Sequence, residues 1–179
     1  MNETLQVLKE RRSIRKYKPE QITGQELDAI LEAGLWAASA KNLQTPVMVV
    51  VQDRETIARM AVLNARIMGA PEGTDPFFGA PTVVVVLADG EQANWLQDGS
   101  LVMGNLMTAA AATGIGSCWV NRAKELFDMT EGKELLRQWG LPETMRGVGN
   151  CVLGYADGPA PAPKPRKEGR ILRPEARHG

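Results

Sequence analysis

Histidine and cysteine are almost absent from this chain of 179 residues. The only histidine is His178, next to the C-terminus, where chains are commonly frayed. Catalytic triads, Cys–His pairs and most zinc sites need a histidine in a well-ordered part of the fold. The sequence therefore argues against all three kinds of site. Cys118 and Cys151 are too few for a disulfide scaffold or a four-thiolate cluster, and we interpret them as small buried hydrophobes. We expect no metal site and a reducing, cytoplasmic setting.

Long apolar runs and net charge are missing as well. The longest apolar strings, 47–51 and 83–88, fall far short of the ~20 residues that span a bilayer. The first residues have neither the basic nor the apolar part of a secretion signal. The 21 basic and 21 acidic residues cancel, whereas a nucleic-acid binder usually presents a broad basic face. We therefore expect one globular domain over 1–179, with neither a membrane nor a nucleic acid as partner.

No glycine-rich phosphate loop of the Walker or dinucleotide-binding type is present, because the run Gly114-Ile115-Gly116 is too short to qualify. The sequence offers no candidate catalytic side chain in a plausible site. If the chain is an enzyme, a bound cofactor carries the chemistry, while the protein supplies orientation and electrostatics.

The basic residues are concentrated at the two ends of the chain. Residues 1–18 carry six Lys/Arg against two Asp/Glu, and residues 164–177 carry the same numbers. Residues 19–163 hold nine basic and seventeen acidic residues. Two such clusters suit a compact anion that both ends reach, because the guanidinium fork matches a phosphate in bidentate fashion. The alternative interpretation is a pair of solvated, flexible termini.

Hydrophobic periodicity predicts alternating helices and strands. We expect strands at 46–52 and 82–88, both buried on two faces because they are continuous apolar runs, and shorter strands at 117–121 and 148–156. We expect helices at 3–12, 23–38, 54–65, 91–113 and 123–139.

Other segments have a composition of their own. The helix at 91–113 is rich in small residues, which places it at the centre of the fold or of a subunit interface. Residues 71–81 read as a loop, and the Pro/Ala-rich tail at 158–179 as an extended arm. We interpret Trp36, at a helical position, as a packing residue.

Four segments in order carry a family resemblance. Residues 11–17 read RRSIRKY, which is similar to the R-R-S-x-R-x-[FY] start of the FMN-dependent nitroreductase family. Residues 38–44, ASAKNLQ, resemble its small-residue loop ending in N-x-Q. Residues 98–119 resemble its central helix and the following turn, and 164–167, KPRK, match its K-P-R-[KR] motif. The resemblance spans nearly the whole chain.

The resemblance implies an α+β fold, a mixed and mostly antiparallel sheet flanked by helices, made as a homodimer with FMN at the interface. It implies the following cofactor contacts. The phosphate and ribityl chain would be held by Arg11, Arg12, Ser13, Lys164 and Arg166. Arg15 would lie near the pyrimidine edge of the flavin, and Asn64 against its polar edge.

The same resemblance assigns the remaining contacts. The partner subunit would supply Ala38, Ser39, Ala40, Asn42 and Gln44. The flavin ring would be lined by Trp119, Val120 and Asn121, with a backbone N–H near Asn121 reaching flavin N5.

The implied activity is transfer of electrons from NAD(P)H to a nitroaromatic, a quinone or a similar small electron-poor acceptor, by a ping-pong mechanism. Arg122 departs from the family pattern, which commonly has a glycine or an acidic residue there, so we assign Arg122 to substrate choice. The alternative is an FMN-binding protein with little turnover, serving storage or regulation, with the ring covered by Arg122 or by the loop at 69–81.

Overall fold

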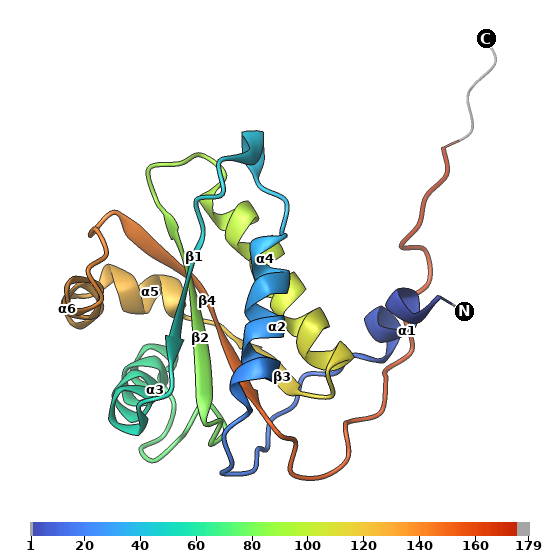
Figure 1. Ribbon diagram of the computed structural model, residues 1–179, viewed down its shortest axis with the longest axis horizontal. Helices are drawn as coiled ribbons and strands as arrows, with labels where there is room; N and C mark the ends of the chain where they lie inside the picture. The colour runs from blue at the N-terminus through green and yellow to red at the C-terminus, as the bar shows by residue number, and fades with distance from the viewer. Residues whose placement is uncertain (1, 175–179) are drawn as a thin grey trace.

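A four-stranded sheet forms the centre of the protein in a computed structural model that describes residues 2–174. Its strands lie in the order β1 (Val47–Val51), β2 (Thr82–Asp89), β4 (Met145–Gly154) and β3 (Gly116–Val120). Every neighbouring pair is antiparallel, and an isolated bridge between Ser13 and Ser117 is the one parallel pairing within residues 2–174. Figure 1 shows helices on both sides of this sheet, as an α+β fold requires.

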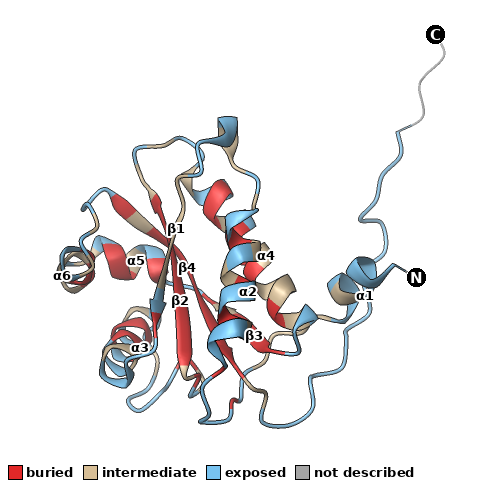
Figure 2. Ribbon diagram, viewed as in Figure 1, coloured by how far each residue is buried: buried red, intermediate tan, exposed pale blue. Residues whose placement is uncertain are grey.

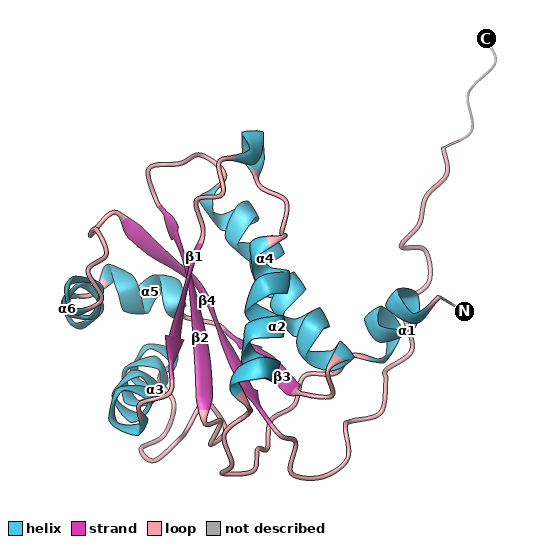
Figure 3. Ribbon diagram, viewed as in Figure 1, coloured by secondary structure: helices cyan, strands magenta, loops and turns pink. Residues whose placement is uncertain are grey.

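The helices make two layers (Figures 1 and 3). One face of the sheet carries α2 (Gly24–Leu35) and α4 (Trp95–Ala112), and the other carries α3 (Arg54–Met68), α5 (Ala123–Asp128) and α6 (Thr130–Gln138). A separate cluster of buried apolar side chains fills each interface. The short α1 (Glu3–Glu10) lies off the edge of the sheet, against α4.

Local sequence signals begin and end these helices. Thr23 and Glu26 form a capping box at the start of α2, as their spacing predicts. The Asp53 carboxylate accepts a hydrogen bond from the Thr56 backbone N–H at the start of α3. Gly69, in the left-handed conformation at φ +64°, ends α3 because glycine adopts that conformation without steric cost.

The small residues of α4 allow close packing against the sheet. A Cβ atom on Gly99 would lie 2.4 Å from Cγ2 of Val148, so only glycine permits this approach of α4 to β4. The helix buries Val102, Met103 and Leu106. It therefore occupies the centre of the fold, which is one of the two places its composition predicts.

Two predictions about burial need correction. The apolar run at 46–52 does not become a strand buried on both faces, since β1 is the edge strand and most of it is only half-buried. The similar run at 82–88 does, because β2 lies between β1 and β4 (Figure 2). Trp36 is not a packing residue within the chain, as 81 % of it is exposed.

The described part of the C-terminal arm is extended. Residues 157–174 contain no helix or strand, are exposed, and run away from the sheet past α1 (Figures 1 and 2). The remainder of the predicted arm, with Arg177 and His178, lies outside the described residues.

Candidate functional site

The N-terminal basic segment is fixed along the edge of the sheet. Beyond its bridge to Ser13, Ser117 accepts a hydrogen bond through its carbonyl from the Ile14 N–H (2.9 Å). The buried Tyr17 pairs with Ala156 and donates its hydroxyl to the Ile14 carbonyl at 2.8 Å. Burial raises the pKa of the Tyr17 phenol well above its usual value, so the phenol remains a neutral donor. These contacts give the preceding arginines a defined position.

Arg11 and Arg12 occupy different environments within this segment. Nη1 of Arg12 donates to the carbonyls of Lys9 and Arg11, both at 2.7 Å. Nη1 of Arg11 is buried and has no hydrogen-bond partner within the described residues. A buried guanidinium nitrogen without an acceptor is costly, and an oxyanion is the ligand that best satisfies it. The site therefore has an unused cationic donor where the sequence predicts a phosphate.

A shallow cavity of about 300 Å³ lies beside this segment. It is formed where residues 13–16 meet the start of the C-terminal arm at 157–161, and Lys16 and Asp157 make an ion pair of 2.6 Å across this contact. The start of the C-terminal arm thus lies beside the N-terminal basic segment. Lys164 and Arg166 lie farther along the exposed arm and, within residues 2–174, make no hydrogen bond or ion pair to Arg11, Arg12 or Ser13.

Two buried asparagines hold the backbone at the end of β3. Nδ2 of Asn64, on α3, donates to the Asn121 carbonyl at 2.8 Å, and Nδ2 of Asn150, on β4, lies 3.5 Å from the Val120 carbonyl. Neither asparagine is exposed, and the Oδ1 atom of each has no partner among the described residues. Asn121 itself is exposed. Residues 120–121 are therefore supported from beneath by side-chain amides.

The residue after Asn121 adopts an unusual backbone conformation. Arg122 lies in the left-handed region at φ +76°, which favours glycine and which costs other residues about 1–2 kcal/mol. Its Nη1 contacts Oε1 of Glu125 at 3.0 Å, and both side chains are partly exposed. The resemblance implies a glycine or an acidic residue soon after Trp119, and a glycine would adopt this backbone conformation without steric cost.

The side chains of Trp119 and Val120 lie on opposite faces of the sheet. The Trp119 ring packs over Gly149, where a Cβ atom would lie 2.6 Å from Nε1, and it joins the apolar cluster beneath α4. Val120 is buried on the α3 side. Cys118 and Cys151 are free and buried, as predicted, and burial raises the pKa of the Cys151 thiol to about 12. A buried thiol with a raised pKa stays protonated near neutral pH, which disfavours a thiolate mechanism at Cys151.

The segment at 38–44 forms a preorganised loop far from the basic segment. Its short helix η1 (Ala40–Asn42) is anchored by the buried carboxylate of Asp98, which accepts the Ala40 N–H at 3.0 Å. Ser39 Oγ accepts the Gln44 N–H, and Gln44 Nε2 donates to Oδ1 of Asn42. Figure 1 places this loop at the end of the molecule remote from α1. One chain alone does not bring it to the basic segment.

Asn150 and Asp98 are the supporting residues that sequence reasoning did not identify. Asp98 is the only charged residue of α4, and Asn150 is a buried polar residue that directly precedes the apolar run 151–153 of β4; these are the signals that mark them. Among residues 2–174 no cluster of three or more His, Cys, Asp or Glu side chains is placed to hold a metal ion. No helix in this part of the chain is long and apolar enough to cross a membrane.

Comparison with known proteins places the chain in a family. The model of the Nitroreductase family matches residues 8–155. A protein of Archaeoglobus fulgidus named "Putative NADH dehydrogenase/NAD(P)H nitroreductase" is 33% identical over 160 residues, which cover 87% of this chain and 86% of that protein. The "FMN reductase [NAD(P)H]" of Bacillus subtilis is 25% identical over 201 residues, covering 99% of this chain and 74% of that protein.

A solved structure agrees with these sequence comparisons. The crystal structure of a nitroreductase with bound FMN from Bacteroides fragilis superposes with a TM-score of 0.88 at 32% identity, over 98% of this chain and all of that chain (100%). Membership of one family therefore accounts for the sheet, the two helical layers and the order of the motifs. The chain belongs to the nitroreductase family.

Proposed function

We propose that this protein is an FMN-dependent oxidoreductase that passes electrons from NAD(P)H to a small electron-poor acceptor such as a nitroaromatic or a quinone. The observation that carries the proposal is Nη1 of Arg11, which is buried and has no partner within residues 2–174, at the position where the family motif predicts the flavin phosphate. The FMN bound to the Bacteroides fragilis nitroreductase and the name of the Bacillus subtilis FMN reductase support the choice of cofactor.

The basic ends of the chain bind the phosphate in this proposal. Arg11, Arg12 and Ser13 supply donors from the fixed edge segment, and Lys164 and Arg166 supply further cations from the arm. An FMN phosphate carries nearly two negative charges near neutral pH, which several charge-assisted hydrogen bonds neutralise.

The isoalloxazine ring occupies the region around the end of β3. Arg15 lies at its pyrimidine edge, where a cation stabilises the negative charge of the reduced ring, and Trp119, Val120 and Asn121 line it. Asn64 positions residue 121 beside the ring, because its buried side-chain amide donates a hydrogen bond to the Asn121 carbonyl. A bound flavin supplies the two-electron chemistry, so the chain itself needs no acid, base or metal.

Two chains complete the site. The preorganised loop with Ala38, Ser39, Ala40, Asn42 and Gln44 reaches the flavin of the partner subunit, because it lies remote from the basic segment of its own chain. Large exposed apolar side chains support a homodimer formed by this side of the molecule. They lie on α1, α2, η1 and α4 and at their ends: Leu5, Leu8, Leu35, Trp36, Leu43, Leu96 and Leu101. Large obligate interfaces are built from such apolar surfaces.

Steady-state kinetics test the order of events. If NAD(P)⁺ leaves before the acceptor binds, initial rates at varied NAD(P)H and acceptor concentrations give parallel double-reciprocal lines. Chelators have no effect on the rate, and alanine at Cys118 or Cys151 changes stability more than turnover. Intersecting lines would show a ternary complex and would refute the ping-pong order.

Substitutions at Arg122 separate its backbone role from its side-chain role. Arg122→Gly and Arg122→Ala both remove the ion pair with Glu125, but only glycine relieves the left-handed backbone. We expect the Arg122→Gly variant to be more stable than Arg122→Ala, with a free energy of unfolding about 1 kcal/mol higher in urea titrations. Both variants keep FMN, and both change the preference for acceptor or for NADPH over NADH. Unchanged preferences in both variants would remove Arg122 from the substrate site.

A further inference from the structure

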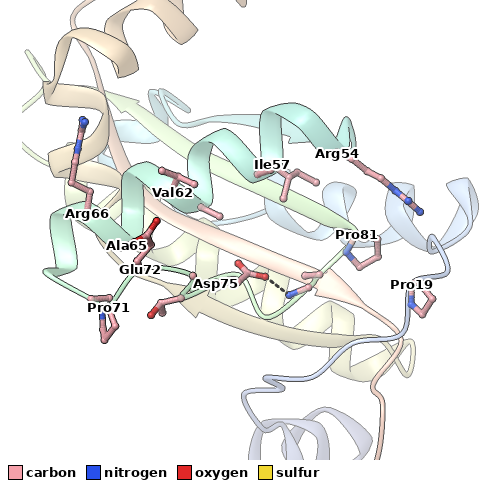
Figure 4. A pocket seen from close by; sticks show the side chains of 17 residues that line it. Pro19, Arg54, Ile57, Val62, Ala65, Arg66, Pro71, Glu72, Asp75 and Pro81 are labelled. Carbon is pink, nitrogen blue, oxygen red and sulfur yellow. Dashed lines mark hydrogen bonds between the residues drawn. The ribbon is translucent and has the colours of Figure 1, made fainter.

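A large cavity lies outside the proposed flavin site. Its volume is about 920 Å³, and it runs between α3 and the segment at 70–81 (Figure 4). Ligand sites in proteins typically have about 300–1,000 Å³ and mainly apolar walls. Nothing in the proposed oxidoreductase function uses this cavity, so its purpose is a separate question.

Small side chains on α3 create the hollow. Ala58, Ala61 and Ala65 follow one another at helical spacing and face the segment at 70–81 across the gap. Ile57 and Val62 extend the apolar wall, and Val62 is 68 % exposed. A larger residue at any of the alanine positions would fill space that the structure leaves open.

The opposite wall is held in place by its own hydrogen bonds. Oδ1 of Asp75 accepts the Phe77 N–H at 2.8 Å, and Oδ2 accepts the Gly79 N–H at 2.6 Å. Phe77 is fully buried in the core and anchors the segment to the sheet. The cavity is thus preformed, and a ligand does not have to order its walls.

The two ends of the cavity differ in available charge. Arg66 lies at one end near Glu72 and is paired with Glu131 at 2.6 Å. Arg54 lies at the other end, beside Pro19 and Pro81, and makes no hydrogen bond or ion pair within residues 2–174. Asp75 already accepts two backbone N–H groups, so the charged side chains of the lining without a hydrogen bond or ion pair among the described residues are Arg54 and the distant Glu72.

We propose that this cavity binds a small monocarboxylate with an apolar or aromatic body. The carboxylate pairs with the Arg54 guanidinium, and the body lies along the alanine wall of α3. Such a ligand needs an apolar surface for its body and a cation for its carboxylate. The cavity offers both, because its walls are mainly apolar and Arg54 at one end has no partner within residues 2–174. The proposal does not depend on the oxidoreductase function, so each can fail separately.

Binding of biphenyl-4-carboxylate to the full-length, FMN-loaded protein tests the proposal. Isothermal titration calorimetry should give one site per chain, and amide resonances of α3 and 70–81 should shift on binding. Arg54→Gln should weaken binding about tenfold, the loss expected for one charge-assisted hydrogen bond. The matched control Arg59→Gln should bind as the parent does, because Arg59 pairs with Glu134 and does not line the cavity. Neutral biphenyl-4-methanol should bind more weakly than the carboxylate and equally to the parent and Arg54→Gln.

A second variant makes the test independent of Arg54. Ala58 is exposed, so Ala58→Trp fills the trough without entering the core, and it should abolish binding while FMN content and NAD(P)H oxidation stay unchanged. The proposal is overturned if no saturable binding occurs below about 1 mM, or if Ala58→Trp binds the probe as the parent does. Tighter binding of biphenyl-4-methylammonium than of the carboxylate would refute a carboxylate ligand. It would instead indicate a cationic ligand that pairs with Glu72.

Discussion

Replacement of both Arg11 and Arg166 by alanine is expected to leave the purified protein mostly without FMN. Arg11 has a buried donor with no acceptor among the described residues, and Arg166 belongs to the second basic cluster, on the arm whose start lies beside the first cluster. Each hydrogen bond to a charged group contributes about 1.5–3 kcal/mol. Loss of two such bonds weakens binding by about 100-fold to 10,000-fold.

The measurement is the flavin absorbance per chain after purification, with the released flavin identified as FMN or FAD by chromatography. The parent should release FMN, because the basic ends suit a terminal monophosphate and the sequence has no dinucleotide motif. Arg59→Ala, an exposed arginine paired with Glu134, serves as the matched control and should keep its flavin. If the double variant holds FMN as tightly as the parent, the assignment of the phosphate to these residues is wrong.

Glutamate at both Leu35 and Trp36 is expected to convert the protein from a dimer to a monomer and to remove its FMN. These side chains are 71 % and 81 % exposed in the single chain, at the end of α2 that leads into the loop at 38–44. Two carboxylates buried in an apolar interface cost several kcal/mol unless they are paired. In the proposed site the partner subunit supplies that loop, so loss of the dimer would also remove part of the site.

Sedimentation velocity and flavin content measured on the same samples separate the two effects. Val62→Glu is the matched control, since Val62 is also large, apolar and 68 % exposed but lies on α3, across the sheet from α2. That control should remain dimeric and yellow. A parent that sediments as a stable monomer at micromolar concentration would refute the dimer, and a double variant that stays dimeric would refute the assignment of this face.

The sequence predicts most of the fold because local signals determine it. The capping box at Thr23 and Glu26 is present, and the expected strand at 82–88 becomes β2, one of the two inner strands of the sheet. The similar run at 46–52 fails as a prediction of burial, because composition does not show which strand lies at the edge of a sheet. The start of β4 at Met145 was also missed, since Arg146 and Gly147 interrupt its apolar pattern.

The candidate site depends on contacts that sequence patterns cannot supply. The motifs indicate which residues belong together, but not that Asn64 is buried beneath Asn121 or that Asn150 lies beside it from β4. Trp36 illustrates the same limit, because a helical position alone does not distinguish a buried residue from an exposed one. Which polar residues are buried beside one another depends on how segments that are distant in sequence pack together.

The central claim, that a bound FMN accepts electrons from NAD(P)H, has one direct test. Purified protein is mixed anaerobically with NADH or NADPH while the flavin absorbance near 450 nm is recorded. We predict that the absorbance bleaches with one equivalent of NADH or NADPH per flavin, and that it returns when a quinone is added. A flavin that stays oxidised with both nucleotides would contradict the account and would favour an FMN-binding protein with little turnover.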